Sequence, residues 1–238
     1  MTKPPRRRIR PLDAWLAIRA LLRDPDDTRQ VFKIVDALSG RTGWRIFRRF
    51  QATEKGARIL SEQRDLLKTL CEREALAALP PGSLGRNYLD FVTREKITPE
   101  GLVAASLEGR QQVEGLGEDY RRTMERLRDM HDLWHVAAGY GRDLVGEASL
   151  LAFTFAQTWN PGVGFIATVA YLRMGDVPGA RDLMREAFRR GRRAAWLPGE
   201  DWEELLTLPL DEVRSRLRLG EPPRYEGVRS AAAPTLAY

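Results

Sequence analysis

The sequence predicts an all-α protein, a single domain built from many helices. Apolar residues recur with a period of about 3.6 along most of the chain, whereas the apolar–polar alternation of half-buried strands is absent. Residues that begin and end helices bracket these periodic segments, and the turns between them are short. We find no internal repeat and no linker that divides the chain. We therefore expect one helical domain over residues 1–220 and an extended C-terminal tail over residues 221–238.

The first half of the chain predicts a series of amphipathic helices. Residues 12–22 form an amphipathic segment that stops before an Asp-Pro sequence. Residues 26–40 begin with aspartates that can cap a helix and end at Gly40, a common helix terminator. The segment 97–112 contains Thr98-Pro99-Glu100, which is typical of a helix N-terminus. Three further helices are expected between these segments, at residues 43–51, 59–79 and 86–96.

The second half predicts one long polar helix at residues 117–138, followed by two apolar helices. Residues 149–172 carry no charge over 24 positions, which is long enough to suggest a transmembrane segment. However, Asn160-Pro161-Gly162 interrupts this stretch in the middle. We therefore expect two buried helices that meet at a turn. They form either part of the hydrophobic core or the wall of an apolar cavity for a hydrophobic ligand.

The net charge of +6 invites a nucleic-acid or membrane partner. Many arginines alternate with acids at helical spacing, as on a solvated helix face, and no nucleic-acid-binding motif is present, so we expect no nucleic-acid partner. The single cysteine, Cys71, excludes an intramolecular disulfide. Two arginine clusters favour peripheral contact with an anionic membrane. These are Arg6, Arg7, Arg8 and Arg10, and Arg185, Arg189, Arg190, Arg192 and Arg193.

The only two histidines of the chain, His131 and His135, lie one helical turn apart. Together with Asp132 they project from one helix face, which is the spacing that lets two imidazoles bind one divalent ion. Glu147 would lie about 18 Å from His135 along a straight helix. If the chain instead reverses at Gly139-Tyr140-Gly141, Glu147 faces His135 at the same level. This spacing predicts a divalent-metal site on a helix and on the segment after a Gly-x-Gly turn.

The residues leave the identity of the metal open. Histidine with carboxylate suits zinc, and it equally suits iron(II), while two carboxylates also suit manganese or magnesium. Peptidase chemistry is disfavoured because Asp132 is shorter than the glutamate of the HExxH motif. A phosphohydrolase of the His-Asp type needs more histidines, and a di-iron bundle needs a second carboxylate–histidine pair.

The pattern His131-Asp132-x-x-His135, followed after eleven residues by Glu147, resembles that of the fourth ubiquinone (coenzyme Q) biosynthesis protein family. Residues 79–92 and 192–217 also resemble segments of this family, so the similarity covers most of the chain. The resemblance implies an all-helical, usually dimeric protein that binds a divalent ion, zinc by preference, at those four residues. It also implies that the protein acts together with other ubiquinone biosynthesis proteins. Without an evident targeting peptide, we expect a bacterial member, cytoplasmic and peripheral to the inner membrane.

Two functions follow from the resemblance. The first is a lyase that removes the C1 carboxyl group of a polyprenylated hydroxybenzoate by oxidative decarboxylation, with Asp132 in a catalytic role, as weak ligand or proton relay. The second is a non-catalytic, lipid-binding scaffold for the other enzymes. A cytosolic metallohydrolase ranks third. Tyr140 and Arg142 are candidates to orient the substrate carboxylate. Three aromatic residues are candidates to contact the prenyl tail: Phe155, Trp159 and Phe165.

Overall fold

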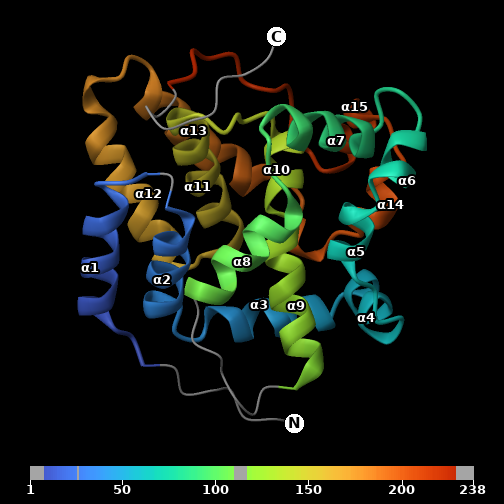
Figure 1. Ribbon diagram of the computed structural model, residues 1–238, viewed down its shortest axis with the longest axis horizontal. Coiled ribbons are helices and arrows are strands. Elements are labelled where there is room, and N and C mark those ends of the chain that lie inside the picture. The colour runs from blue at the N-terminus through green and yellow to red at the C-terminus, as the bar shows by residue number, and fades with distance from the viewer. Residues whose placement is uncertain (1–7, 26, 110–116, 229–238) are drawn as a thin grey trace.

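The computed structural model describes residues 8–25, 27–109 and 117–228, and these ranges form an all-α domain (Figure 1). Apart from an isolated antiparallel bridge between Ser83 and Pro209, the described ranges contain no extended pairing. The helices of the first half are α1 (Pro11–Leu21), α2 (Thr28–Leu38), α3 (Thr42–Gln51), α4 (Glu54–Ser61), α5 (Leu66–Cys71), α6 (Arg73–Ala78), α7 (Leu84–Arg94) and α8 (Pro99–Gly109). Those of the second half are α9 (Glu118–Asp129), α10 (His131–Ala138), α11 (Leu144–Thr158), α12 (Pro161–Arg173), η1 (Met174–Asp176), α13 (Ala180–Arg193), η2 (Leu197–Gly199), α14 (Trp202–Leu206) and α15 (Leu210–Arg216).

Short polar side chains fix the beginnings of several helices. The Asp143 carboxylate accepts hydrogen bonds from the backbone N–H groups of Val145 and Gly146 at the start of α11. Asn160 accepts in the same way at the start of α12. Such N-caps satisfy donors that have no partner within the helix and contribute about 1 kcal/mol each. Equivalent caps precede α2, α4, α5, α7 and α14, and their residues are Asp27, Thr53, Asp65, Ser83 and Asp201.

The largest hydrophobic core lies between α7, α10, α11, α13 and α14. Its fully buried members include Tyr88, Leu133, Phe153 and Trp202. Helices α11 and α13 approach closely at Gly191, where an added Cβ would lie 2.7 Å from the Phe153 carbonyl oxygen. Burial of each large side chain contributes about 1.5–3 kcal/mol, so this core holds α10 and α11 firmly in place.

Two smaller cores support the rest of the bundle. Helices α1, α2 and α12 share one that includes Ile18, Ile34 and Ile166, and α1 lies at the outer edge of the molecule (Figure 1). Helices α3, α4 and α9 share the other, which includes Phe50 and Tyr120.

The apolar stretch 149–172 does form parts of two helices, α11 and α12, that meet at a turn. Trp159 ends α11 in the left-handed conformation, with φ of 50°, before Asn160 caps α12. Helix α12 is less buried than the sequence suggests, since Leu172 near its end is 64% exposed. Within the described ranges, none of the helices combines the length and the apolar character needed to traverse a bilayer.

Two expected helices are divided. The segment 59–79 spans the end of α4, then α5 and α6, because Gln63 takes a positive φ of 51° and Asp65 caps a new helix. The segment 117–138 is split into α9 and α10 at Met130, whose ψ of −2° interrupts the α-helical geometry. The backbone hydrogen bonds into and out of Met130 persist. Both histidines therefore lie on a helix that begins at His131.

The described part of the predicted tail, residues 221–228, has no regular secondary structure but does pack on its own chain. The Leu144 N–H donates to the Val228 carbonyl oxygen at 2.7 Å, and the Tyr225 hydroxyl contacts the turn before α11. The remaining tail residues, 229–238, lie outside the described ranges. The described part of the tail thus covers the α10–α11 turn.

The structure also corrects the predicted basic clusters. Arg190 is only 7% exposed, and its guanidinium donates to the carbonyl oxygens of Ala138, Leu219 and Glu221. It is therefore part of the fold and cannot reach a membrane. Arg10 forms an ion pair of 2.5 Å with the buried Asp36 carboxylate. Arg6 and Arg7 lie outside the described residues.

Candidate metal centre

The first turn of α10 gathers three potential metal ligands. One ligand atom each from His131, Asp132 and His135 lie within 4.8 Å of one another. The two imidazole rings are nearly perpendicular, at 74°, with centroids 4.8 Å apart. The helical spacing alone brings these groups together, as the sequence predicts.

The Gly-x-Gly turn brings a fourth group to the same place. Gly139 ends α10 in the left-handed conformation, with φ of 78°, and the chain reverses into α11. As a result, the Glu147 Oε2 atom lies 3.5 Å from the His135 Nε2 atom. The reversal is tight because Gly146 touches the turn, where an added Cβ would lie 2.2 Å from the Gly141 carbonyl oxygen. The predicted hairpin geometry is therefore present.

The hydrogen bonds of His135 determine which of its ring nitrogens is free. Its Nδ1 atom lies 3.0 Å from the Tyr140 carbonyl oxygen, which can only accept, so Nδ1 carries the proton and donates. The Nε2 atom is buried and makes no hydrogen bond with any described group. Its nearest charged neighbour is the Glu147 carboxylate, at 3.5 Å, and a cation held by both groups would give the buried nitrogen the close partner that it lacks. The site therefore fits a divalent ion.

Charge and burial act in opposite directions on the groups of this site. Burial alone would raise the pKa of Glu147, but the neighbouring histidines, His135 above all, lower that pKa to about 2. Burial would likewise raise the pKa of Asp132, and the hydrogen bond and charge of His131 lower it. For His135, burial favours the neutral ring, yet the negative charge of Glu147 raises its pKa. Both carboxylates are thus ionised at neutral pH, as metal ligands must be.

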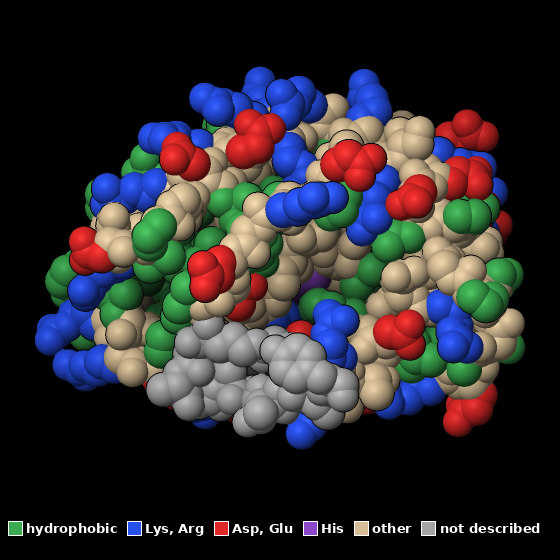
Figure 2. All heavy atoms as spheres, turned by 90° about the horizontal axis from the view of Figure 1, so that it is seen from above, with side chains coloured by type: hydrophobic (Ala, Val, Ile, Leu, Met, Phe, Trp, Pro, Cys, Tyr) green, Lys and Arg blue, Asp and Glu red, His purple; other side chains and the backbone are tan. Residues whose placement is uncertain are grey.

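The site opens to solvent on one side. The side chains of His131 and Glu147 are 37% and 34% exposed, whereas that of His135 is fully buried and its ring stacks on Phe91. Figure 2 shows a histidine side chain recessed in a depression of the face seen from above. A separate shallow hollow between α6 and α7, bordered by Arg73 and Lys96, includes none of the predicted site residues. Two nitrogens and two carboxylates at an open site leave room for a further ligand.

The other predicted site residues are more dispersed. The Arg142 Nε atom lies 3.4 Å from the Glu147 Oε1 atom, beside the candidate ligands. The Tyr140 hydroxyl points into the core and accepts from Arg190 at 2.8 Å, so only its carbonyl oxygen reaches the site, through His135. Phe155 and Trp159 pack with Phe188 toward the other end of α11. The remaining residue, Phe165, packs against the core of α1, α2 and α12.

One contributor escapes the sequence pattern. The Tyr225 hydroxyl accepts from the Gly141 N–H at 2.8 Å and donates to the Asp143 carboxylate at 2.8 Å. Asp143 in turn caps the helix that carries Glu147, so Tyr225 supports the turn that places this fourth candidate ligand. Nothing in the sequence links Tyr225 to a turn more than 80 residues earlier, although Asp143 itself has the form of an N-cap.

Removal of this hydroxyl is expected to weaken divalent-ion binding without unfolding the protein. In Tyr225→Phe the ring stays in place, but Gly141 and Asp143 lose a shared partner, so affinity should fall about tenfold. Titration calorimetry with Zn²⁺ measures the change. Tyr171→Phe is the matched control, since its hydroxyl accepts from Arg185 on the surface. Equal affinities for the two variants would show that the tail does not support the site.

The chain is similar to known proteins over most of its length. The sequence model of the coenzyme Q (ubiquinone) biosynthesis protein Coq4 family matches residues 11–223. The chain is 30% identical over 175 residues to the mitochondrial ubiquinone biosynthesis protein coq4 of Schizosaccharomyces japonicus, covering 72% of this chain and 70% of that protein. It is 28% identical over 209 residues to the mitochondrial COQ4 homolog of Danio rerio, covering 86% and 74%. For the Penicillium rubens protein, at 29% identity, the match spans 60% of the relative.

A solved structure supports the fold. It is a crystal structure of a protein from Nostoc punctiforme, provisionally named as a ubiquinone biosynthesis protein. The two folds superpose with a TM-score of 0.62 at 22% sequence identity, over 89% of this chain and 99% of that one. The family model covers nearly all of the described helices, and curated relatives across fungi and a vertebrate bear the same name. The chain is a ubiquinone biosynthesis protein and belongs to the coenzyme Q biosynthesis protein Coq4 family.

Proposed function

We propose that the chain binds one divalent cation through His131, Asp132, His135 and Glu147, and decarboxylates C1 of a polyprenylated hydroxybenzoate. The observation that carries the proposal is the buried Nε2 atom of His135, which lies 3.5 Å from Glu147 and makes no hydrogen bond with the described residues. A bound cation next to the substrate head group would draw electron density from the ring and stabilise negative charge as carbon dioxide leaves. Zinc is the first candidate, and iron, manganese and magnesium are the others.

The proposed reaction exchanges a carboxyl group for a hydroxyl group. The bond from C1 to the carboxyl carbon breaks, carbon dioxide leaves, and C1 gains an oxygen atom. Relative to the acid and water, the phenol and carbon dioxide have lost two electrons and two protons. Dioxygen is the oxidant that we propose, and with oxygen from water it would be reduced to hydrogen peroxide. One carboxylic acid, one water and one dioxygen then give one phenol, one carbon dioxide and one peroxide.

Two charged side chains would interact with the substrate head group or with the cation at the site. Arg142 lies beside Glu147 and is half-buried, so its guanidinium is available to orient a carboxylate at the open side. Asp132 has a lowered pKa and faces His131, which favours its role as an ionised ligand over that of a proton carrier.

A partly buried stripe of α11, whose Leu151 also packs against the core of α1, α2 and α12, supports binding of the prenyl tail. Half-buried or exposed side chains follow one another at helical spacing from Glu147 through Leu151 and Phe155 to Trp159. This stripe is about 18 Å long and becomes apolar after its first residue. A prenyl chain that left the metal along it would end at the aromatic cluster of Phe155, Trp159 and Phe188. Each buried methylene contributes about 0.8 kcal/mol.

The test is decarboxylation by the purified protein. Zn²⁺-, Fe²⁺- and Mn²⁺-loaded protein is incubated, with and without dioxygen, with a short-chain prenylated hydroxybenzoate labelled with carbon-13 in the carboxyl group. We expect labelled carbon dioxide and a hydroxylated ring from at least one metal form, and none from Glu147→Gln. Trp159→Glu should raise KM much more than it lowers kcat, because it places a charge at the exposed end of the stripe that binds the tail.

The alternative function, a non-catalytic lipid-binding scaffold, predicts that the protein binds the lipid and releases no carbon dioxide. If every metal form binds the labelled lipid but releases no carbon dioxide, the decarboxylase proposal is wrong and the scaffold is favoured. Phosphatase or esterase turnover without lipid binding would instead favour a metallohydrolase.

The same proposal includes the setting of the protein. We propose a homodimer that works with other ubiquinone biosynthesis enzymes at the cytoplasmic face of a bacterial inner membrane. The dimer and the partners rest on the family resemblance, and the membrane on the substrate's prenyl tail.

A further inference from the structure

Helix α1 has apolar side chains around most of its circumference, with only Asp13 and Arg19 charged, yet the protein covers only one side of it. Ala14, Ala17 and Ile18 are buried against α2 and α12. On the opposite side, Leu12, Trp15 and Leu16 are 68%, 55% and 57% exposed. A helix that is apolar all round is normally buried on all sides. The apolar residues on the exposed side of α1 therefore predict that another surface covers this side.

These exposed residues are concentrated on one face. Of the nine large hydrophobic residues exposed in the described ranges, five lie between residues 9 and 22. At 100° per residue, Leu12, Leu16, Trp15 and Leu22 fall within one arc of the helix, together with the exposed Arg19 and Arg23. We call this the α1 outer face, and define it as Ile9, Leu12, Trp15, Leu16, Arg19, Leu22 and Arg23. Figure 1 shows α1 on the perimeter of the molecule, outside α2.

The charge of this face is positive. Arg19 and Arg23 lie within the arc, and Arg8 is exposed just before the helix. Two acids lie at the edge of the arc: Asp13 forms an ion pair of 3.4 Å with Arg10, and Asp24 directly follows Arg23. Leucines, a tryptophan and arginines on one helix face are the composition of helices that lie in the interface of anionic membranes.

We propose that the α1 outer face inserts into the interface of a bilayer that contains anionic lipid. The helix lies parallel to the membrane, with its leucines and Trp15 among the upper acyl chains. Arg19 and Arg23 extend their guanidinium groups back to the lipid phosphates. This inference rests on the membrane setting of the proposed function and names the element that makes the contact, but it involves neither the metal site nor the stripe on α11.

A second copy of the chain fits the face less well. In a two-fold symmetric dimer the same patch meets itself, so Arg19 and Arg23 of both copies would lie close together in the centre of the contact. Charged residues are depleted from the centre of protein interfaces, and like charges there repel. A layer of lipid phosphates instead attracts them.

The test compares vesicle binding of matched variants. Wild-type protein and the double variant Leu12→Ser/Leu16→Ser are sedimented with vesicles of phosphatidylcholine alone or of equal parts phosphatidylcholine and phosphatidylglycerol. We expect the wild type to bind the mixed vesicles, less so at high salt, and the double variant to bind about tenfold or more weakly. The matched control is Leu107→Ser/Leu172→Ser, since both of these leucines are 64% exposed, on α8 and α12. It should bind like the wild type.

Two further variants complete the design. Arg19→Gln/Arg23→Gln should remove the preference for phosphatidylglycerol while leaving thermal unfolding unchanged. His135→Ala should bind vesicles like the wild type, which separates this inference from the metal site. Equal vesicle binding by wild type and Leu12→Ser/Leu16→Ser would overturn the proposal. So would a wild-type dimer that the double variant converts to monomer, because a second copy would then cover the face.

Discussion

His135→Ala is expected to lower the affinity for Zn²⁺ by at least about a hundredfold, since loss of a supporting group alone costs 10–100-fold. His135 is a candidate ligand whose Nδ1 atom donates to the Tyr140 carbonyl oxygen and whose other ring nitrogen is buried next to Glu147. Alanine removes that nitrogen and leaves Glu147 with Arg142 as its nearest charged neighbour. Competition with a chelating dye on metal-free protein measures the affinity.

Thermal unfolding gives an independent measurement of the same change. A ligand that binds only the folded state, present at 100 times its Kd, adds about 2.7 kcal/mol to the unfolding free energy. Zn²⁺ should therefore raise the Tm of the wild type and raise that of His135→Ala far less, because a hundredfold weaker site gains only about 0.4 kcal/mol at the same concentration. Glu74→Gln, an exposed acid on α6, should respond like the wild type. An equal rise for His135→Ala would place the bound ion elsewhere in the chain.

The geometry of the candidate site was predictable because it depends on short-range rules. The periodicity of an α-helix fixes His131, Asp132 and His135 on one face, and a glycine that tolerates positive φ marks the reversal that returns Glu147. The same rules predicted the all-helical fold and the break between α11 and α12, because Asn160 and Pro161 are typical of a helix start.

Features that depend on distant parts of the chain were not predictable in this way. The support of the turn by Tyr225 joins segments more than 80 residues apart, and the burial of Arg190 depends on carbonyl groups from the end of α10 and from the tail. Arginine at such a position looks, in sequence, like any other charge on a helix face. The division of residues 59–79 into three helices was not predictable either, because a glutamine side chain gives no indication of the left-handed conformation that Gln63 adopts.

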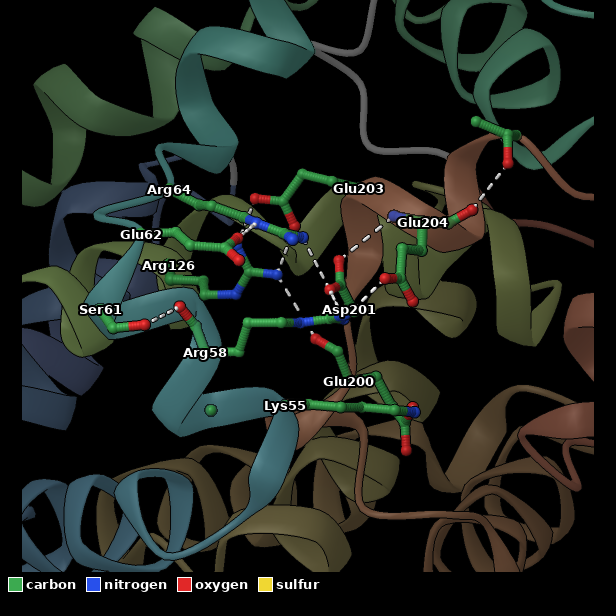
Figure 3. A network of polar contacts seen from close by, with 12 residues as sticks. Lys55, Arg58, Ser61, Glu62, Arg64, Arg126, Glu200, Asp201, Glu203 and Glu204 are labelled. Carbon is green, nitrogen blue, oxygen red and sulfur yellow. Dashed lines mark hydrogen bonds and ion pairs between the residues drawn. The ribbon is translucent and has the colours of Figure 1, made fainter.

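A buried carboxylate joins the C-terminal helices to the N-terminal half of the bundle (Figure 3). Asp201 is 1% exposed, and one of its oxygens accepts from Arg58 and from Arg64, each at 2.7 Å. Its other oxygen accepts from the Glu204 N–H at 3.2 Å and caps α14. Next to it, the buried Arg126 donates two hydrogen bonds to Glu203. One residue thus serves both a helix start and a contact between α4 and α14.

Asp201→Ala is therefore expected to lower the free energy of unfolding by about 3 kcal/mol, because it removes a buried acceptor of two guanidinium groups together with an N-cap. For a chain of this size the Tm should fall by roughly 6–12 °C. Asp201→Asn keeps the cap acceptor but not the charge, so its loss should be smaller. Glu212→Ala, which breaks only a surface pair with Arg216, is the control and should cost less than about 0.5 kcal/mol. Because the network lies apart from His135, Zn²⁺ should raise the Tm of Asp201→Ala by as much as that of the wild type. Equal Tm values for Asp201→Ala and Glu212→Ala would contradict this prediction. The contacts of Arg58 and Arg64 with Asp201 would then add nothing to the free energy of unfolding.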